Sequence, residues 1–228
     1  GGCIPGDPAF LLGLRALADE TGALLILDEV MTSRLSFGGR QALLGLRPDL
    51  TTLGKYFGGG LSFGAFGGRA DLLQRFDPRA SGALQHAGTF NNNVLTMAAG
   101  MAGLTQVLTA GRLQALNDRG DALRERLNEL LASRGVALQF TGLGSLMTMH
   151  PVAGAIRSAD DLAAADDRVK ALVFFELLAR GVFMARRGFV ALSLPFDDAA
   201  ADTLVDAMQD VVQQRCALLG TPLATMTA

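Results

Sequence analysis

The chain has 228 residues, of which half are hydrophobic and 18% are charged, and its formal net charge is −2 at pH 7. This length allows one large domain or two small ones, and the composition argues against a disordered chain. The near-neutral charge and the absence of a basic patch argue against a nucleic-acid or anionic-membrane surface. No apolar run approaches the roughly 18 residues of a membrane span, and no secretory signal is visible.

The first elements predict an α/β layer. Asp7 and Pro8 supply a cap and a first-turn proline for a helix that runs to about Thr21, and Gly22 closes this helix. Residues 23–27 form a continuous apolar run, which is the pattern of a strand covered on both faces. A helix followed by a buried strand favours an α/β domain with parallel strands.

The next segments are shorter and more irregular. Residues 30–45 show no regular pattern, whereas residues 50–53 predict a short strand and residues 63–67 predict another, antiparallel or at an edge. Residues 70–76 predict one or two helical turns. Residues 81–93, SGALQHAGTFNNN, are small and polar and predict a shaped loop.

The second half of the chain predicts a smaller α+β domain. In order, its segments predict helices over 94–110 (capped by Asn93) and 112–133, strands over 136–140 and 144–150, a helix over 161–180, strands over 181–184 and 189–194, and a helix over 197–219. We therefore expect one domain over residues 1–110 and a second over residues 111–228, with a frayed tail after Gly220.

The cysteines, the histidines and the first residues predict the compartment, the absence of a metal site and the part of the protein that this chain represents. Cys3 and Cys216 lie at opposite ends without a pairing pattern, which favours a reducing compartment and a cytoplasmic protein. His86 and His150 have no Cys or His at metal-ligand spacing, so we expect no metal site. The chain starts without methionine in GGCIPGDPAF, and we expect it to be the C-terminal part of a longer protein.

One lysine and one aspartate stand out. Lys55 is one of only two lysines, the other being Lys170, and it follows a predicted strand. We interpret the glycines around it as bare backbone that lets a ligand approach closely: Gly54, Gly58, Gly59 and Gly60. Asp28 ends the apolar strand, at the edge where open α/β folds place ligand-binding groups. Glu29 points the other way, so the two carboxylates do not form an acid/base pair.

Each of these residues also has an ordinary interpretation. Asp28 can equally cap a helix or pair with an arginine, and Lys55 can be a surface lysine. Together, however, an aspartate and a lysine on neighbouring strand ends suit pyridoxal phosphate (PLP). Burial lowers the pKa of a lysine, and a neutral amine is the nucleophile for Schiff-base chemistry. The aspartate would keep the pyridine nitrogen protonated. A nucleotide P-loop is rejected, because Tyr56 follows Lys55 where Ser or Thr is required.

Four motifs occur in order: LLILDEVMTSR, PDLTTLGKYFGGG, FGAFGGRADLL and HAGTFNNNVLTMAAG. With them the chain resembles the class III, fold type I, PLP-dependent aminotransferases over nearly its whole length. It lies close to the glutamate-1-semialdehyde aminomutase branch and, through HAGTFNNN and ARRGFVALSLP, to β-phenylalanine aminotransferases. The resemblance implies the C-terminal part of a large, mainly parallel-sheet domain followed by a small α+β domain. It also implies that the N-terminal half, which supplies the phosphate-binding loop, lies outside this chain.

The resemblance assigns cofactor roles residue by residue. Asp28 matches the partner of the pyridine nitrogen, and Val30 matches the side chain that packs behind the cofactor ring. Lys55 matches the lysine that binds the cofactor covalently and then serves as general base and acid. Thr89 matches the threonine that reaches the cofactor phosphate of the neighbouring subunit, which implies a homodimer.

Substrate recognition is assigned in the same way. Arg187 matches an arginine that lines the substrate pocket and can meet a carboxylate. A surface ion pair is the alternative for Arg187, and Arg186 is one residue away and would face oppositely on a strand. The resemblance implies transamination of a β-amino acid such as β-phenylalanine, with a 2-oxo acid such as 2-oxoglutarate as acceptor. The alternatives are glutamate-1-semialdehyde 2,1-aminomutase and a catalytically inert fragment that lacks the phosphate-binding half.

Overall fold

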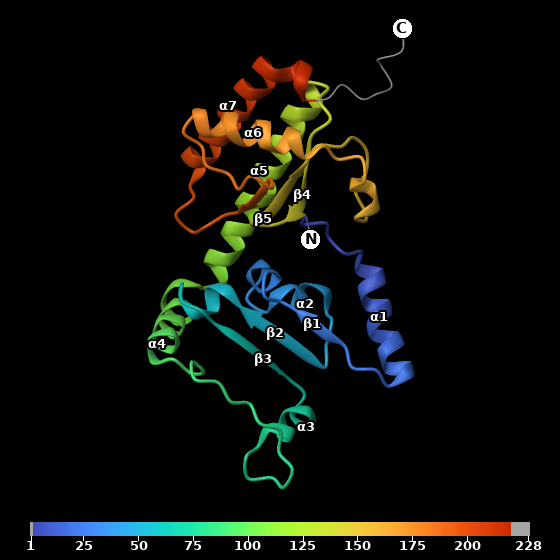
Figure 1. The fold of residues 1–228 in the computed structure, drawn as a ribbon, viewed down its shortest axis with the longest axis vertical. Coiled ribbons are helices and arrows are strands. Elements are labelled where there is room, and N and C mark those ends of the chain that lie inside the picture. Colours follow the sequence, from blue (N-terminus) through green and yellow to red (C-terminus); the bar gives the residue numbers. More distant parts are fainter. Residues whose placement is uncertain (1, 220–228) are drawn as a thin grey trace. The chain divides into compact units, whose positions relative to one another are not determined.

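The computed structural model describes residues 2–219 (Figure 1). The chain forms two compact units. We call Asp7–Gln114 the Lys55 unit, and the described residues 2–6 together with 115–219 the C-terminal unit. The predicted domain boundary between residues 110 and 111 stays a prediction, and the predicted fraying after Gly220 lies outside the described residues.

The Lys55 unit contains a three-stranded sheet in the order β1-β2-β3, formed by Ile26–Asp28, Leu50–Gly54 and Gly64–Gly68. β1 runs parallel to β2, and β3 runs antiparallel to β2. Its helical segments are α1 (Pro8–Thr21), η1 (Thr32–Leu35), α2 (Gly39–Leu44), η2 (Lys55–Gly58), α3 (Ala70–Leu73), η3 (Gln74–Phe76), α4 (Val94–Ala102) and η4 (Gly103–Val107). The predicted parallel pair and the antiparallel third strand are confirmed.

α1 shows why the first helix could be predicted. The Asp7 carboxylate accepts the backbone N–H of Phe10 at 2.9 Å, Pro8 occupies the first turn, and Gly22 takes a left-handed conformation after the last residue. The same chemistry caps α4, where the Asn93 side chain accepts the backbone N–H groups of the first turn. Both predicted caps are confirmed.

Two predictions for this unit are wrong. The apolar run 23–27 was expected to be covered on both faces, but β1 is only three residues long and Ile26 is 57% exposed. A strand is buried on both faces only when layers cover both of them, and the described residues leave Leu24 and Ile26 uncovered. Segment 30–45 was expected to be irregular, but it contains η1 and α2.

The C-terminal unit contains an antiparallel sheet in the order β4-β5-β6, formed by Gln139–Leu143, Leu146–His150 and Phe189–Ala191. Its helical segments are α5 (Ala110–Ser133, which begins in the Lys55 unit), η5 (Asp160–Leu162), α6 (Asp167–Ala179), α7 (Asp198–Arg215) and η6 (Cys216–Leu218). α6 and α7 lie against each other (Figure 1). The core combines side chains from helices and sheet, among them Leu123, Leu127, Leu131, Met147, Met149, Leu177, Met208 and Val211.

The predicted strand over 181–184 is wrong. The backbone N–H groups of Gly181 and Val182 turn back to the carbonyls of Leu178 and Leu177, at 3.0 and 2.9 Å. This is the hydrogen-bond pattern of a glycine-terminated helix end. The amides that a strand would use are therefore consumed in closing α6.

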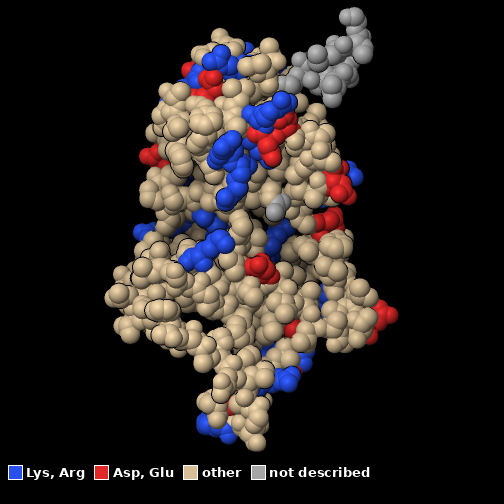
Figure 2. Space-filling model, viewed as in Figure 1, with Lys and Arg blue, Asp and Glu red and all other residues tan. Residues whose placement is uncertain are grey.

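The distribution of surface charge and the hydropathy of the helices match what the sequence composition indicates. On the face shown in Figure 2, acidic and basic side chains are interspersed between uncharged areas. Within residues 2–219 no single helix is long and apolar enough to cross a membrane. One pair of helical segments with a bend between them, Val94–Val107 and Ala110–Ser133, reaches the length and apolar composition of a membrane span when the two are taken together. Length and composition alone are weak evidence for a span.

Candidate active site

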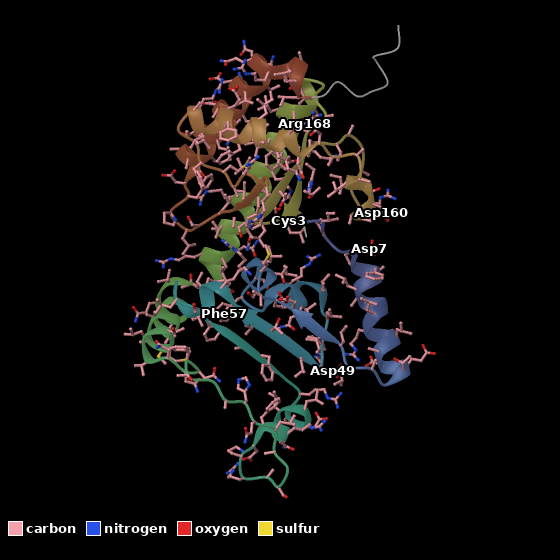
Figure 3. All side chains as sticks on the ribbon, viewed as in Figure 1. Cys3, Asp7, Asp49, Phe57, Asp160 and Arg168 are labelled. Atoms are coloured by element: carbon pink, nitrogen blue, oxygen red, sulfur yellow. The ribbon has the colours of Figure 1, made fainter. Side chains whose placement is uncertain are left out.

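The candidate site lies at the carboxyl ends of β1 and β2. These strands are parallel, with Asp28 opposite Thr52, so their carboxyl ends share one edge of the sheet. Figure 3 shows Asp49 and Phe57 toward opposite ends of β2. Lys55 directly follows β2 and belongs to the Phe57 end. The fold thus brings Asp28, Val30 and Lys55 to one edge of the sheet, as predicted for ligand-binding groups in open α/β folds.

Asp28 is held through one of its two oxygens. Its Oδ1 accepts the backbone N–H of Val30 at 2.9 Å and the hydroxyl of Thr52 at 3.2 Å. In residues 2–219, no hydrogen bond or ion pair reaches Oδ2, and the side chain is exposed. The carboxylate is therefore oriented while one oxygen remains open. Thr52 was not identified as a site residue from the sequence, although its place opposite Asp28 follows once the two strands are aligned.

Lys55 has an unusual backbone and an open amine. Its φ of 54° lies in the left-handed region, which costs a non-glycine residue roughly 1–2 kcal/mol. Such strain clusters at functional sites. The side chain is exposed, so the buried setting considered from the sequence is not what the described residues provide. Among these residues its Nζ has no hydrogen bond or ion pair, whereas the other lysine, Lys170, pairs with Asp167 at 3.2 Å.

The glycines near Lys55 have a different role from the one predicted. A Cβ atom at Gly59 would lie 2.4 Å from the carbonyl carbon of Ala99, and one at Gly58 would lie 2.7 Å from Cβ of Phe63. These glycines therefore let η2 pack against α4 and the residues before β3. Interpreting them as clearance for a ligand is wrong at these two positions, because protein atoms already occupy the space. Only Gly60 faces open space.

Val30 is half-buried and packs beside the end of β2. Its Cγ1 lies 3.3 Å from the position that a Cβ atom would take at Gly54. The absence of a side chain at Gly54 therefore allows Val30 to approach the strand that carries Lys55. An apolar side chain stands next to the exposed carboxylate of Asp28.

Asp49 fixes the other end of β2. Its carboxylate is 6% exposed and accepts hydrogen bonds from Arg15 at 2.7 Å, from Arg69 at 2.7 Å and from the backbone N–H of Leu25 at 2.8 Å. The Arg15 guanidinium, followed by the Leu25 amide and Arg69, holds the pKa of the Asp49 carboxyl far below its usual range. This cluster ties the segment before β1 to the start of β2, and so supports the strand pair that carries the candidate site.

Glu29 belongs to a separate cavity. It is fully buried, and its carboxylate accepts the backbone N–H of Gln41 at 2.7 Å and the Thr32 hydroxyl. The cavity, of about 370 Å³, is also lined by Ser33 and by Tyr56, whose O–H donates to the Ser33 hydroxyl at 3.1 Å. Burial raises the pKa of Tyr56. Asp28 is exposed while Glu29 is buried, which confirms that they point different ways.

Thr89 lies in an exposed turn before α4, next to Phe90, which is 87% exposed. Three residues earlier, the ring of His86 lies edge-on to Phe66 and Phe76, with ring centroids 5.4 and 6.0 Å apart. These contacts attach the loop to β3 and η3. No sequence pattern around His86 predicts this role.

Arg187 belongs to the C-terminal unit. Arg186 and Arg187 occupy the centre of a turn between the segments 181–184 and 189–194, and the Gly188 N–H closes this turn by donating to the Ala185 carbonyl at 2.7 Å. The Arg187 Cζ atom lies 5.0 Å from the ring centroid of Phe189. Within residues 2–219 no ion pair involves Arg187, so the predicted alternative of a surface ion pair is not observed.

Comparison with known proteins gives the family. The class-III aminotransferase model matches residues 1–212, so the chain belongs to the class III aminotransferase family. It is 58% identical over 218 residues to the beta-phenylalanine transaminase of Variovorax paradoxus, covering 96% of this chain and 50% of that protein. It is 39% identical over 215 residues to a glutamate-1-semialdehyde 2,1-aminomutase of Nitratidesulfovibrio vulgaris, covering 92% of this chain and 50% of that protein.

Solved structures agree with this result. The structure of a beta-phenylalanine aminotransferase from Variovorax paradoxus matches with a TM-score of 0.93, over 95% of this chain and 50% of that chain. A structure described as a transaminase with PLP bound matches with a TM-score of 0.84 at 28% identity, over 95% of this chain and 50% of that chain. The predicted α/β fold of fold type I transaminases is confirmed. The chain spans about half the length of the relatives it matches.

Proposed function

We propose that the protein transfers the amino group of a β-amino acid, such as β-phenylalanine, to a 2-oxo acid such as 2-oxoglutarate, with PLP as cofactor. The observation that carries this proposal is the 58% identity to a beta-phenylalanine transaminase. The strained Lys55, at the same sheet edge as Asp28, adds support from the structure.

The residues at this edge fit PLP. The cofactor needs an amine for covalent attachment, and the Lys55 amine has no partner among the described residues. Its pyridine nitrogen needs a carboxylate, and Asp28 has an oriented group with an open oxygen. Val30 supplies an apolar side chain beside them. When bound, PLP supplies an electron sink for negative charge that develops on the amine-bearing carbon.

The residues of this chain would then share the chemical work. Lys55 Nζ takes the proton from the amine-bearing carbon of the donor and returns it as general acid. The negative charge of Asp28 favours a protonated pyridine nitrogen beside it. The Arg187 guanidinium binds the donor carboxylate, for which its planar fork of donors is suited. The Thr89 hydroxyl donates to the cofactor phosphate of a neighbouring subunit.

We also propose that the active protein is a homodimer. Several large apolar side chains are exposed on α4 and in the turn before it, namely Phe90, Val94, Leu95 and Met101. Exposed apolar patches of this kind mark interaction sites. We further propose that residues 1–110 belong to the large domain and residues 111–228 to the small domain. The free thiols Cys3 and Cys216 support a reducing, cytoplasmic location.

The test is an assay of the full-length gene product with PLP, β-phenylalanine and 2-oxoglutarate. We expect glutamate to form only when both substrates are present, because the acceptor must take the amino group. Glutamate formation with no dependence on β-phenylalanine, or none at all, would contradict the proposal.

The aminomutase is the second candidate, supported by the 39% identity to that enzyme. Its reaction moves the amino group within one molecule, so it would proceed without an added 2-oxo acid. The inert-fragment alternative concerns the 228-residue chain by itself. Size-exclusion chromatography with PLP titration of this chain would detect it as a species that neither dimerises nor gains cofactor absorbance.

A further inference from the structure

A rigid turn in the C-terminal unit presents two adjacent arginines. The turn Ala185–Gly188 is closed by a 2.7 Å hydrogen bond, and the Gly188 carbonyl accepts the backbone N–H of Met149 at 2.9 Å. Gly188 has a φ of 82°, and a Cβ atom there would lie 2.8 Å from the Met149 carbonyl oxygen. Only glycine fits this position, so the turn is pinned against β5.

The two arginines lie on different aromatic rings. The Arg186 Cζ atom lies 6.0 Å from the ring centroid of Phe175, which is on α6. The Arg187 Cζ atom lies 5.0 Å from that of Phe189, which is the first residue of β6 and pairs with Thr148 of β5. The ring under Arg187 is therefore carried by a strand of the central sheet of this unit.

When a guanidinium lies over a ring face, the hydrogen-bond donors at the edge of the guanidinium remain available. The attraction between the cation and the ring holds the group near the ring without using any N–H. In the described part of the chain, no hydrogen bond or ion pair uses the donors of Arg187. The structure thus contains a guanidinium over an aromatic ring, with donors that have no partner among the described residues.

We propose that Phe189 is a positioning residue for substrate binding: its ring holds the Arg187 guanidinium in the position from which its N–H groups meet the carboxylate of the amino donor. This inference rests on the proposed function. A long side chain that is already ordered loses less entropy when it binds, so the stacked ring increases affinity for the carboxylate. The chemistry takes place elsewhere, so Phe189 affects KM and leaves kcat nearly unchanged.

The test measures kcat and KM for β-phenylalanine in the PLP-loaded full-length protein. We expect Phe189→Leu to raise KM roughly three- to tenfold, in line with the cost of ordering one rotamer-rich side chain, with little change in kcat. Phe189→Tyr keeps the ring and should restore the wild-type KM. Phe175→Leu is the matched control, because it removes the ring under Arg186, and it should leave KM unchanged.

A double-mutant cycle tests whether Phe189 acts on KM through Arg187. Arg187→Lys keeps the charge and loses the planar fork, so it should raise KM at least as much as the loss of the ring. Adding Phe189→Met to Arg187→Lys should then raise KM no further. If Phe189→Leu fails to fold, Phe189→Met replaces it as the variant that lacks the ring.

The outcomes separate the inference from the proposed function. An unchanged KM in both non-aromatic variants would overturn the inference, as would equal effects at Phe189 and Phe175 or additive effects of Phe189 and Arg187. A wild-type protein that does not turn over β-phenylalanine would overturn the proposed function, and the inference with it.

Discussion

The two units of this chain bury their apolar residues very differently. The C-terminal unit has a continuous core in which Leu127, Met147 and Val211 are completely buried. In the Lys55 unit, the buried hydrophobic side chains of the described residues are only Ala18, Leu35, Leu46 and Leu113. Many of its large apolar side chains are exposed instead, including Phe10, Leu17, Leu24, Ile26, Phe90, Val94, Leu95 and Met101.

The proposed catalytic residues lie in the unit with the smaller buried core. The C-terminal unit closes its own core and presents one rigid turn with Arg187. The Lys55 unit carries Asp28 and Lys55 on a small sheet whose strand β1 is largely uncovered. Its described contacts also include polar ties, such as the Asp49 cluster, and close backbone packing at Gly59. We expect substitutions in the two units to differ accordingly.

The largest expected effect on stability is in the C-terminal core. Leu127→Ala removes a side chain with no exposed surface, so it should lower the free energy of unfolding by about 2–5 kcal/mol. Leu24→Ala, at a residue that is 51% exposed in the Lys55 unit, should change it by about 0.5 kcal/mol or less. Chemical denaturation of the 228-residue chain measures both. Equal losses would show that the two units do not differ in the way described.

A smaller effect is expected where η2 meets α4. Gly59→Ala would place a Cβ atom 2.4 Å from the backbone of Ala99, whereas Gly60→Ala meets no atom within 4 Å. Both glycines have positive φ, so both variants carry backbone strain. The overpacking at Gly59 should add about 1–3 kcal/mol of destabilisation. If the two variants have the same melting temperature, the close approach is not what fixes η2.

The smallest effect concerns pH and the C-terminal unit. The His150 Nε2–H donates to the Gly2 carbonyl at 2.8 Å, the side chain is 1% exposed, and its buried Nδ1 has no partner among the described residues. Burial lowers the pKa of His150 below its usual value, with a smaller contribution from the positive charge of Lys170; the hydrogen bond to Gly2 opposes this shift. Protonation would place a charge in the interior.

The sign of the pH effect follows from linkage. The stabilising contribution of neutral His150 is complete above the usual histidine pKa of about 6.5. As the pH falls below this value, the unfolded chain takes up a proton first, and stability falls by at most about 1.4 kcal/mol per pH unit. His150→Gln can still donate to Gly2 but does not titrate, so its stability should depend less on pH. Parallel curves for the two proteins between about pH 7 and 5 would contradict this account.

Local chemistry explains which elements could be predicted. The Asp7-Pro8 start and the Gly22 end of α1 are written in adjacent residues, as is the Asn93 cap of α4. Burial depends on what covers an element, and an apolar run cannot show this, so the cover over β1 was predicted wrongly. The segment 181–184 has apolar residues that suit a strand, but its amides close the preceding helix.

Prediction of the candidate site is limited in the same way, because some of its features depend on tertiary structure. The strand ends that carry Asp28 and Lys55 follow from the sequence, because an apolar run and a short strand place them there. The tie from Thr52 requires the register of two strands, and the strain at Lys55 requires its backbone angle. The ring under Arg187 requires knowing that residues 185–188 form a turn. Gly59 was misinterpreted because Ala99 of α4, forty residues later, occupies the space beside it.

The central claim is that Lys55 carries the proposed transamination, and the visible absorption spectrum tests it most directly. The full-length product, loaded with PLP, should show a long-wavelength band that bleaches with β-phenylalanine and returns with 2-oxoglutarate. Lys170→Ala, at the other lysine of the chain, should behave in the same way. Lys55→Ala should lose this cycle, with a rate loss of about 10²–10⁴-fold or more from the missing general base and acid alone. A Lys55→Ala protein that still completes the cycle at near wild-type rate would contradict the account.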